Sequence, residues 1–362
     1  MAKLLSICIP TLQRRDSVKS VLDGLLEVVK KHQDEVEICV SDNASTDGTY
    51  EMLMAYSKKY QFIHVRRNKE NLGLDASLAE LAKMSEGTYH WPVGDDDEIV
   101  PEGVESLIAL LKKRDWLAGL VFAGLETDRK IMGKYFPAES YTRDEFISHY
   151  IDYIKHTEYF APGFGFVGCL LYRTETLKAV LKCFEGKGFG WVQLSMYLHI
   201  ISQNDGRIVI VHQSPIDYGS PPDKVYYPEQ EVYTFSERKL KAMQVADMKP
   251  ELKAAVESVL TNLDRQYVRG LLELILIKDI VPKERYEKSK NKIIEIGKNV
   301  KLLSLWGLLG LFMRLIEKVP GAAYPFRLIP KLNNYSRKIK KHEEGLLRTN
   351  EEREAIDKWK QK

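Results

Sequence analysis

The stretch YHWPVGDDDE, residues 89–98, sets the interpretation of the whole chain. An apolar, aromatic segment leads directly into three consecutive aspartates, and Ile-Val-Pro follows at 99–101. A buried strand that ends here would place three carboxylates at the carboxyl edge of a sheet, where open α/β sheets bind ligands. Adjacent carboxylates repel one another, whereas a hard divalent cation such as Mg²⁺ or Mn²⁺ prefers oxygen ligands. The alternative is a solvated acidic turn before a helix N-terminus, where Asp and Glu are also favoured.

Strand and helix patterns alternate on both sides of this stretch. Four short apolar runs predict buried strands at residues 3–11, 35–40, 62–66 and 88–93. Four amphipathic stretches predict helices at residues 16–31, 50–60, 76–84 and 104–112. This alternation predicts an α/β fold with a doubly wound, mostly parallel sheet flanked by helices. The loops after parallel strands share one edge, so Thr11, Asp42 and the aspartate triplet should converge, which favours the metal interpretation.

The second half of the chain changes character. Further strand patterns occupy residues 119–124 and 207–211, and helical patterns occupy 144–154 and 192–202. Prolines and glycines at 215–228 mark the end of the sheet. Lys-rich helical patterns then replace strand signals. We therefore predict a sheet domain at 1–230, a helical extension at 231–341 and a charged tail at 342–362.

The composition excludes several classes of protein. The 362 residues are 44% hydrophobic and 29% charged, and a net charge of +3 is too small to indicate a nucleic-acid partner. The four cysteines are isolated and form no zinc motif. We find neither a signal peptide nor an apolar run of the ~18 to 20 residues that span a bilayer. These features predict a cytoplasmic protein with free thiols.

At these positions the sequence resembles the family 2 nucleotide-sugar glycosyltransferases, which have the Rossmann-like GT-A fold. Four segments carry the resemblance in order: SICIPT at 6–11, CVSDNASTDGT at 39–49, NKENLG at 68–73, and GDDD at 94–97 followed by Pro101. Residues 168–177, with Arg173, are similar to the family's central strand. Within the family the chain is most similar to bacterial O-antigen and capsule transferases of the abequosyltransferase type. The resemblance covers residues 3–215.

The resemblance, together with the chemistry of the side chains, implies a donor site at the sheet edge. Asp42 would accept hydrogen bonds from the nucleobase, Thr11 would lie beneath it, and Asp95 would hold ribose hydroxyls. Asp96 and Asp97 would hold Mn²⁺ or Mg²⁺ in the manner of a DXD motif, and the ion would stabilise the leaving diphosphate. Asp96, five residues before Pro101, would be the direct ligand. The predicted donor-binding residues are Pro10, Thr11, Asp42, Asn43, Asn71, Asp75, Asp95 and Asp96. For Asp75 the alternative is an N-cap of the following helix.

The general base is the missing part. Inverting members of the family carry an acidic pair just before the helix predicted at 192–202, but FGWVQ at 189–193 has no group there that accepts a proton. Glu185 is the nearest carboxylate and is the predicted base. Asp205 and His199 are alternatives, as is a mechanism that rests on donor activation. His212 is a candidate metal ligand, against the alternative of a structural histidine.

The helical extension raises the question of a membrane. The run LLSLWGLLGLFM at 302–313 is too short to cross a bilayer, and basic residues follow it at 327–341. This pattern favours a segment on the membrane surface, and the resemblance implies a polyprenyl-linked saccharide acceptor at the inner face of the cytoplasmic membrane. The alternative is that these helices bury their apolar faces against one another or in a homo-oligomer.

The sequence therefore predicts an inverting, metal-dependent glycosyltransferase of bacterial surface polysaccharide biosynthesis. It would move a sugar from a nucleotide-sugar donor to a saccharide acceptor. One alternative is a nucleotidyltransferase, but TLQRR at 11–15 lacks the glycines of a phosphate loop. The other is a catalytically silent, membrane-tethered scaffold, which the missing base keeps open.

Overall fold

The computed structural model describes residues 3–122, 126–157, 166–185, 191–217, 245–260 and 263–297, with four single positions beyond them. The described residues divide into two compact units. One contains residues 3–217 together with 245–259, and the other begins at residue 260. Residues 245–259, which follow the boundary predicted at residue 230, group with the sheet unit.

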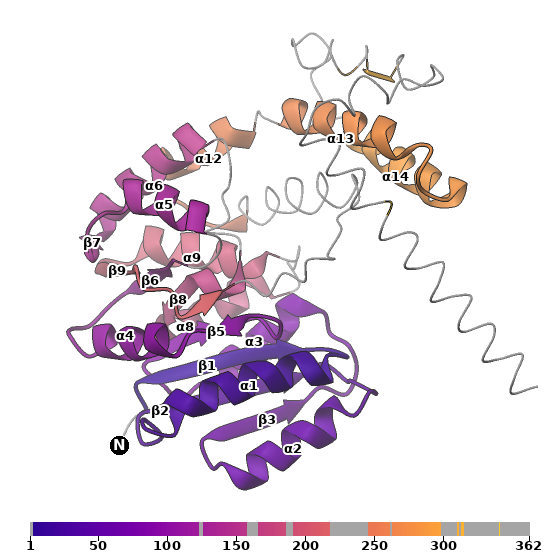
Figure 1. Ribbon diagram of the computed structural model, residues 1–362. Coiled ribbons are helices and arrows are strands. Elements are labelled where there is room, and N and C mark those ends of the chain that lie inside the picture. Colours follow the sequence, from indigo (N-terminus) through magenta and orange to yellow (C-terminus); the bar gives the residue numbers. More distant parts are fainter. Residues whose placement is uncertain are drawn as a thin grey trace, which may run out of the picture. The chain divides into compact units, whose positions relative to one another are not determined.

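The first unit is built on an eight-stranded sheet with the order β3-β2-β1-β4-β8-β6-β9-β7 (Figure 1). Its strands are β1 (Leu5–Thr11), β2 (Val36–Asp42), β3 (Ile63–Arg67), β4 (Tyr89–Pro92), β6 (Ala118–Val121), β7 (Ser140–Thr142), β8 (Leu170–Arg173) and β9 (Arg207–Val211). Strands β1 to β4 pair in parallel, as do β6 and β9. The pairs made by β8 and β7 are antiparallel. The predicted mostly parallel α/β sheet is confirmed.

Helices flank the sheet on both faces (Figure 1). The helices of this unit are α1 (Arg15–Val29), α2 (Thr49–Lys59), α3 (Leu74–Met84), α4 (Pro101–Leu111), α5 (Glu126–Tyr135), α6 (Arg143–Thr157), α8 (Thr174–Phe184), α9 (Val192–Gln203) and α12 (Pro250–Leu260), with the short 3-10 helix η1 (Val167–Cys169). The apolar stripe of α1 is buried against the sheet, as the helical spacing predicts. Helices α1, α2 and α4 share one hydrophobic cluster with β1, β2 and β4.

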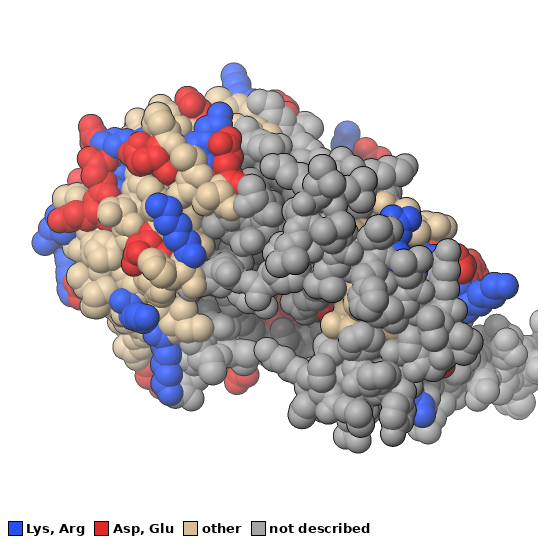
Figure 2. All heavy atoms as spheres, turned by 90° about the horizontal axis from the view of Figure 1, so that it is seen from above, with Lys and Arg blue, Asp and Glu red and all other residues tan. Residues whose placement is uncertain are grey.

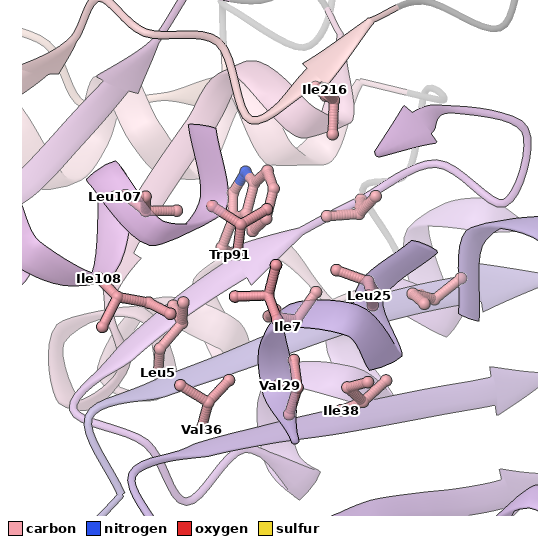
Figure 3. Close-up of a cluster of buried hydrophobic side chains, with 14 of the residues drawn as sticks. Leu5, Ile7, Leu25, Val29, Val36, Ile38, Trp91, Leu107, Ile108 and Ile216 are labelled. Atoms are coloured by element: carbon pink, nitrogen blue, oxygen red, sulfur yellow. The ribbon is translucent and has the colours of Figure 1, made fainter. Parts of the chain in front are cut away.

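Trp91 lies at the centre of that cluster. Figure 3 shows its indole among Leu107 of α4, Ile7 of β1 and Ile216. Trp91 has no exposed surface, and its Nε1 donates a hydrogen bond to the carbonyl oxygen of Gly168 at 2.9 Å. The strand that leads into the aspartates is therefore fixed by both packing and a directed hydrogen bond.

A second, two-stranded sheet follows the aspartates and was not predicted. It pairs β5 (Glu98–Ile99) with β10 (Ile216–Asp217) in antiparallel orientation. The Val100 backbone also donates to the carbonyl oxygen of Pro215 at 2.9 Å. The loop that carries the aspartates is thus anchored at its far end by a segment more than a hundred residues away in sequence. Strands this short leave no periodic signal, and β7 and helix α5 were missed as well.

Gly103 makes this anchoring possible, and its replacement by alanine is expected to lower stability. A Cβ at Gly103 would lie 2.0 Å from the backbone oxygen of Ser214. We expect Gly103→Ala to reduce the free energy of unfolding by about 1–3 kcal/mol because the backbones must separate. Gly133→Ala is the control: it also lies within a helix, but its Cβ would meet nothing closer than 4.0 Å. That change should stabilise the helix by about 0.5–1 kcal/mol. Denaturant titration that gave both variants the same sign would contradict this assignment.

The second unit contains α13 (Leu263–Ile277) and α14 (Lys283–Gly297), which pack against each other. The apolar run at 271–277 is almost entirely buried in this unit, which matches the alternative of helices that cover one another. In the part of the chain that the structure describes, no helix is both long and apolar enough to cross a membrane. Most of the run at 302–313 and the basic residues at 327–341 lie outside the described residues, as does the charged tail.

Candidate functional site

The carboxyl ends of the parallel strands bring the predicted residues together. In the sheet register, Thr11 at the end of β1 lies beside Asp42 at the end of β2, and Asp42 lies beside Arg67 at the end of β3. The Thr11 hydroxyl donates a hydrogen bond of 2.8 Å to Oδ2 of Asp95, although 84 positions separate them in the chain. Thr11, Asp42 and the aspartate triplet therefore share one edge of the sheet, as parallel topology requires.

Two of the three aspartates converge on one cation, which is an arginine. Nη1 of Arg14 lies 3.1 Å from Oδ1 of Asp95 and 2.6 Å from Oδ2 of Asp96. Burial raises the pKa of Asp95 above its ordinary value, while the charge of Arg14 and the Thr11 hydroxyl limit that rise. A charged carboxylate withdrawn from water in this way is stabilised by a positive partner, which Arg14 supplies here.

Asp97 is oriented differently from its neighbours. Its Oδ2 accepts a hydrogen bond of 2.8 Å from the backbone N–H of Gly94 and so closes the turn that carries the triplet. A Cβ on Gly168 of η1 would lie 3.5 Å from the same oxygen, which places η1 directly beside the turn. The structure thus gives Asp97 a role in shaping the loop, and its predicted role as a metal ligand stays a prediction.

Arg14 is held in place by an unusual backbone conformation. Gln13, the residue before it, has a φ of 54°, a left-handed conformation that non-glycine residues seldom adopt. The backbone N–H of Gln13 donates to Oγ of Ser45 at 2.9 Å, and its side-chain amide bonds to both the backbone and the hydroxyl of Thr46. The loop after β2 therefore fixes the turn that aims Arg14 at the aspartates.

Asp42 is fully buried and bonds to its own loop. Both of its carboxylate oxygens accept the backbone N–H of Ser45 at 3.3 Å, and Nε of Arg67 lies 3.4 Å from Oδ2. Arg67 also stacks over the ring of Tyr50, with its guanidinium 4.7 Å from the ring centroid. In the described structure Asp42 thus holds the loop, and its predicted contact with a nucleobase remains a prediction.

Asn43 and Asn71 are joined to each other. The Asn43 amide donates to Oδ1 of Asn71 at 2.7 Å, while its own oxygen accepts from Asn68 at 3.0 Å and from the Leu72 backbone at 2.9 Å. Asn43 therefore fastens the loop after β2 to the turn before α3. If either asparagine binds the donor, as predicted, it does so as part of this hydrogen-bond network. Pro10 lies in the last, fully buried part of β1.

Asp75 connects two helices and does not cap its own. The N-cap of α3 is Gly73, so the N-cap interpretation of Asp75 is wrong. Asp75 lies in the first turn, and its Oδ1 accepts the backbone N–H of Val192 at 3.3 Å, at the start of α9. This contact ties the start of α3 to the start of α9, and the predicted donor-binding role of Asp75 stays a prediction.

The candidate bases have unequal surroundings. Glu185 is exposed at the end of α8 and has no hydrogen bond or ion pair within the described part of the chain, while residues 186–190 lie outside it. Asp205 pairs with Arg143 at 2.6 Å, and Nδ1 of His199 accepts the Asp247 backbone N–H at 3.3 Å. Both alternatives thus have structural partners, whereas no partner of the Glu185 carboxylate lies among the described residues.

His212 contacts an aromatic ring and a backbone carbonyl group. Its ring packs edge-on against Phe122, with centroids 4.7 Å apart, and its Nε2 lies 3.2 Å from the carbonyl oxygen of Ala138. Within the described residues, no group of three or more His, Cys, Asp or Glu side chains is assembled for a metal ion. These contacts favour the structural interpretation of His212.

The aspartate cluster nevertheless fits a divalent ion by its chemistry. Oxygens of Asp95 and Asp96 already converge within 3.1 Å of one positively charged nitrogen. Carboxylate oxygens from one or two residues, completed by phosphate oxygens and water, are the usual environment of Mg²⁺ in nucleotide enzymes. Arg14 occupies the position that such an ion would share.

A mostly parallel α/β sheet with an aspartate cluster at the carboxyl ends of its strands is the arrangement of the GT-A fold of nucleotide-sugar transferases. Residues 6–181 match the Glycosyl transferase family 2 model, and this part of the chain belongs to that family. Both the predicted family and the predicted fold are confirmed.

Known proteins similar to this chain fall in the same class. Abequosyltransferase RfbV of Salmonella typhimurium is 39% identical over 29% of this chain and 31% of its own length. The putative teichuronic acid biosynthesis glycosyltransferase TuaG of Bacillus subtilis is 26% identical over 41% of this chain and 58% of its own length. The chain therefore spans less than two thirds of either relative. The mannosyltransferase PcManGT of Pyrobaculum calidifontis, solved with GDP-Man and Mn²⁺, has a TM-score of 0.52 at 14% identity, covering 91% of this chain and 88% of its own.

Sequence analysis missed Arg14 as a site residue. Arg14 lies three positions after Thr11, in the loop that leaves β1 at the sheet edge, and that position was the available signal. Basic residues in loops are common, however, and the left-handed turn at Gln13 that aims Arg14 is invisible in a sequence.

Proposed function

We propose that this chain is a metal-dependent glycosyltransferase that transfers a sugar from a nucleotide-sugar donor to a saccharide acceptor with inversion. The observation that carries the proposal is the contact of Thr11, Arg14, Asp95 and Asp96 at the carboxyl edge of a family 2 sheet. The similarity to surface-polymer enzymes supports a lipid-linked acceptor in bacterial surface polysaccharide assembly. PcManGT was solved with both a nucleotide sugar and Mn²⁺, which supports the same pair here.

The residues divide the work of the reaction. Asp42 and the loop it holds receive the base, Asp95 receives the ribose hydroxyls, and Asp96 with Asp97 would hold Mn²⁺ or Mg²⁺. A bound divalent ion would supply the positive charge that makes the nucleoside diphosphate a good leaving group. Glu185, exposed and without a partner in the described structure, would take the proton of the acceptor hydroxyl.

A product assay with the full-length chain tests the proposed function. Incubation with a panel of nucleotide sugars should release nucleoside diphosphate, and the release should depend on Mn²⁺ or Mg²⁺. A nucleotidyltransferase would release pyrophosphate from a nucleoside triphosphate instead. A scaffold would release neither product with any donor and any metal, and that result would overturn the proposal.

The basic segment is expected to bring the protein to anionic lipid. We propose a peripheral location on the inner face of the cytoplasmic membrane, supported by the basic residues at 327–341. Each Lys or Arg near an anionic surface contributes about 1 kcal/mol, so reversing three charges should cost at least tenfold in vesicle binding. The variant is Lys338→Glu, Lys340→Glu and Lys341→Glu, measured by sedimentation with phosphatidylserine-containing vesicles.

The matched control reverses the charges of three lysines elsewhere in the chain, by the same Lys→Glu substitution. Lys58, Lys69 and Lys182 are exposed and unpaired in the described structure, and they lie on the sheet unit. Figure 2 shows acidic and basic side chains interspersed on the described part of that surface. The control variant should therefore sediment like the wild type. If both triple variants lose binding equally, net charge is responsible, and the C-terminal segment is not the anchor.

A further inference from the structure

Arg14 contacts both carboxylates of the aspartate pair, whereas an ordinary surface ion pair joins one cation to one carboxylate. One nitrogen, Nη1, contacts both carboxylates, at 3.1 Å from Asp95 and 2.6 Å from Asp96. The side chains of Asp95 and Asp96 are only 13% and 26% exposed, whereas that of Arg14 is 41% exposed. Two adjacent carboxylates with restricted access to water repel each other unless a cation lies between them.

The position of Arg14 is held by a strained turn. Gln13 adopts a φ of 54°, and three hydrogen bonds to Ser45 and Thr46 keep it there. Backbone strain that the surrounding structure enforces is concentrated at functional sites. Ser45 also donates its backbone N–H to Asp42, so one connected set of contacts runs from Asp42 to the aspartates.

Arg14 and a divalent ion would compete for the same oxygens. Oδ2 of Asp96 cannot bind a metal ion at about 2.1 Å and keep a guanidinium nitrogen at its present distance without bringing two positive charges into close contact. The Arg14 side chain is partly exposed and can move. Asp95, in contrast, is held by Thr11, and the loop that carries both aspartates is anchored through β5 and β10.

We propose that Arg14 is an exchangeable internal counter-ion of the aspartate pair. It neutralises Asp95 and Asp96 while no metal is bound, and it leaves Asp96 when a divalent ion binds. This inference rests on the proposed metal site. The competition with Arg14 lowers the affinity of the site for a metal ion alone. The ion therefore binds well only together with a diphosphate, because the diphosphate gives the displaced guanidinium a new anionic partner.

The test is binding of Mn²⁺ alone to the full-length chain. The paramagnetic resonance signal of free Mn²⁺ reports binding without substrate or turnover. Loss of one competing ion pair should make Arg14→Met bind Mn²⁺ about tenfold more tightly than the wild type. Arg14→Lys keeps the charge and should stay close to the wild type. Arg15→Met is the matched control, because the neighbouring Arg15 forms no ion pair with either aspartate.

Thermal unfolding midpoints show whether a change in Mn²⁺ binding comes from a folding defect. Arg14→Met should have a lower unfolding midpoint than the wild type without metal, and saturating Mn²⁺ should close that gap. If the wild type binds Mn²⁺ measurably and Arg14→Met binds it equally or more weakly, the counter-ion role alone is overturned. If neither the wild type nor Arg14→Met binds Mn²⁺, the proposed metal site fails and the inference falls with it.

Discussion

Replacing Asp96 by asparagine is expected to reduce metal-dependent release of nucleoside diphosphate by about 10³-fold. A metal ion contributes several kcal/mol of charge stabilisation to a leaving group, and each 1.36 kcal/mol is a factor of about ten in rate. Asparagine preserves the shape of the side chain but removes the charge. Because Asp95 keeps its contacts with Thr11 and Arg14, stability should change by less than about 1 kcal/mol.

A substitution of Asp97 distinguishes a metal ligand from a residue that only shapes the loop. Asp97→Asn keeps an amide oxygen that can still accept the Gly94 N–H, so its turn should survive. If Asp97 also binds the metal, its loss of activity should approach that of Asp96→Asn; if it only closes the turn, the loss should be slight. Asp115→Asn removes an equal charge from an exposed site and serves as the control. Wild-type rates for Asp96→Asn, with Mn²⁺ dependence retained, would exclude Asp96 as the metal ligand.

The donor side of this site was accessible to sequence reasoning because parallel topology has strict consequences. Once strand and helix alternate, the ends of β1, β2 and β4 must meet, and Thr11 and Asp95 do so over 84 residues of separation. The contacts that fix these groups were not accessible. Arg14 depends on a single left-handed residue, and the anchoring of the triplet depends on two two-residue strands, β5 and β10.

The contact of Asp75 with the start of α9 was not accessible to sequence reasoning either. Asp75 is joined to Val192, 117 positions away in the sequence, by one hydrogen bond. The periodicity of the sequence does not predict such a contact. Local capping preferences suggested an N-cap, but tertiary structure gave that position to Gly73. Single long-range hydrogen bonds decide loop geometry, and sequence patterns report mainly faces and periods.

Trp91 joins the stability of the fold to the geometry of the site. It belongs to the strand that ends at the aspartates, and it is fully buried. Its indole donates to the carbonyl oxygen of Gly168, a residue on which a Cβ would lie 3.5 Å from Oδ2 of Asp97. Trp116 offers a close comparison, because it is also buried and its Nε1 donates to a backbone oxygen, that of Leu110, at 3.0 Å. Trp116 follows α4 and precedes β6, and none of its described hydrogen bonds involves the aspartate turn.

Trp91→Ala and Trp116→Ala should each lower the free energy of unfolding by about 3–5 kcal/mol, because both leave a large cavity in the core. Only Trp91→Ala should also weaken binding of Mn²⁺ by the protein that remains folded, since η1 would lose its attachment beside Asp97. Urea unfolding midpoints and Mn²⁺ titrations at low temperature separate the two effects. Equal loss of metal affinity in both variants would mean that general destabilisation, and not the Trp91–Gly168 contact, controls the geometry of the aspartate turn.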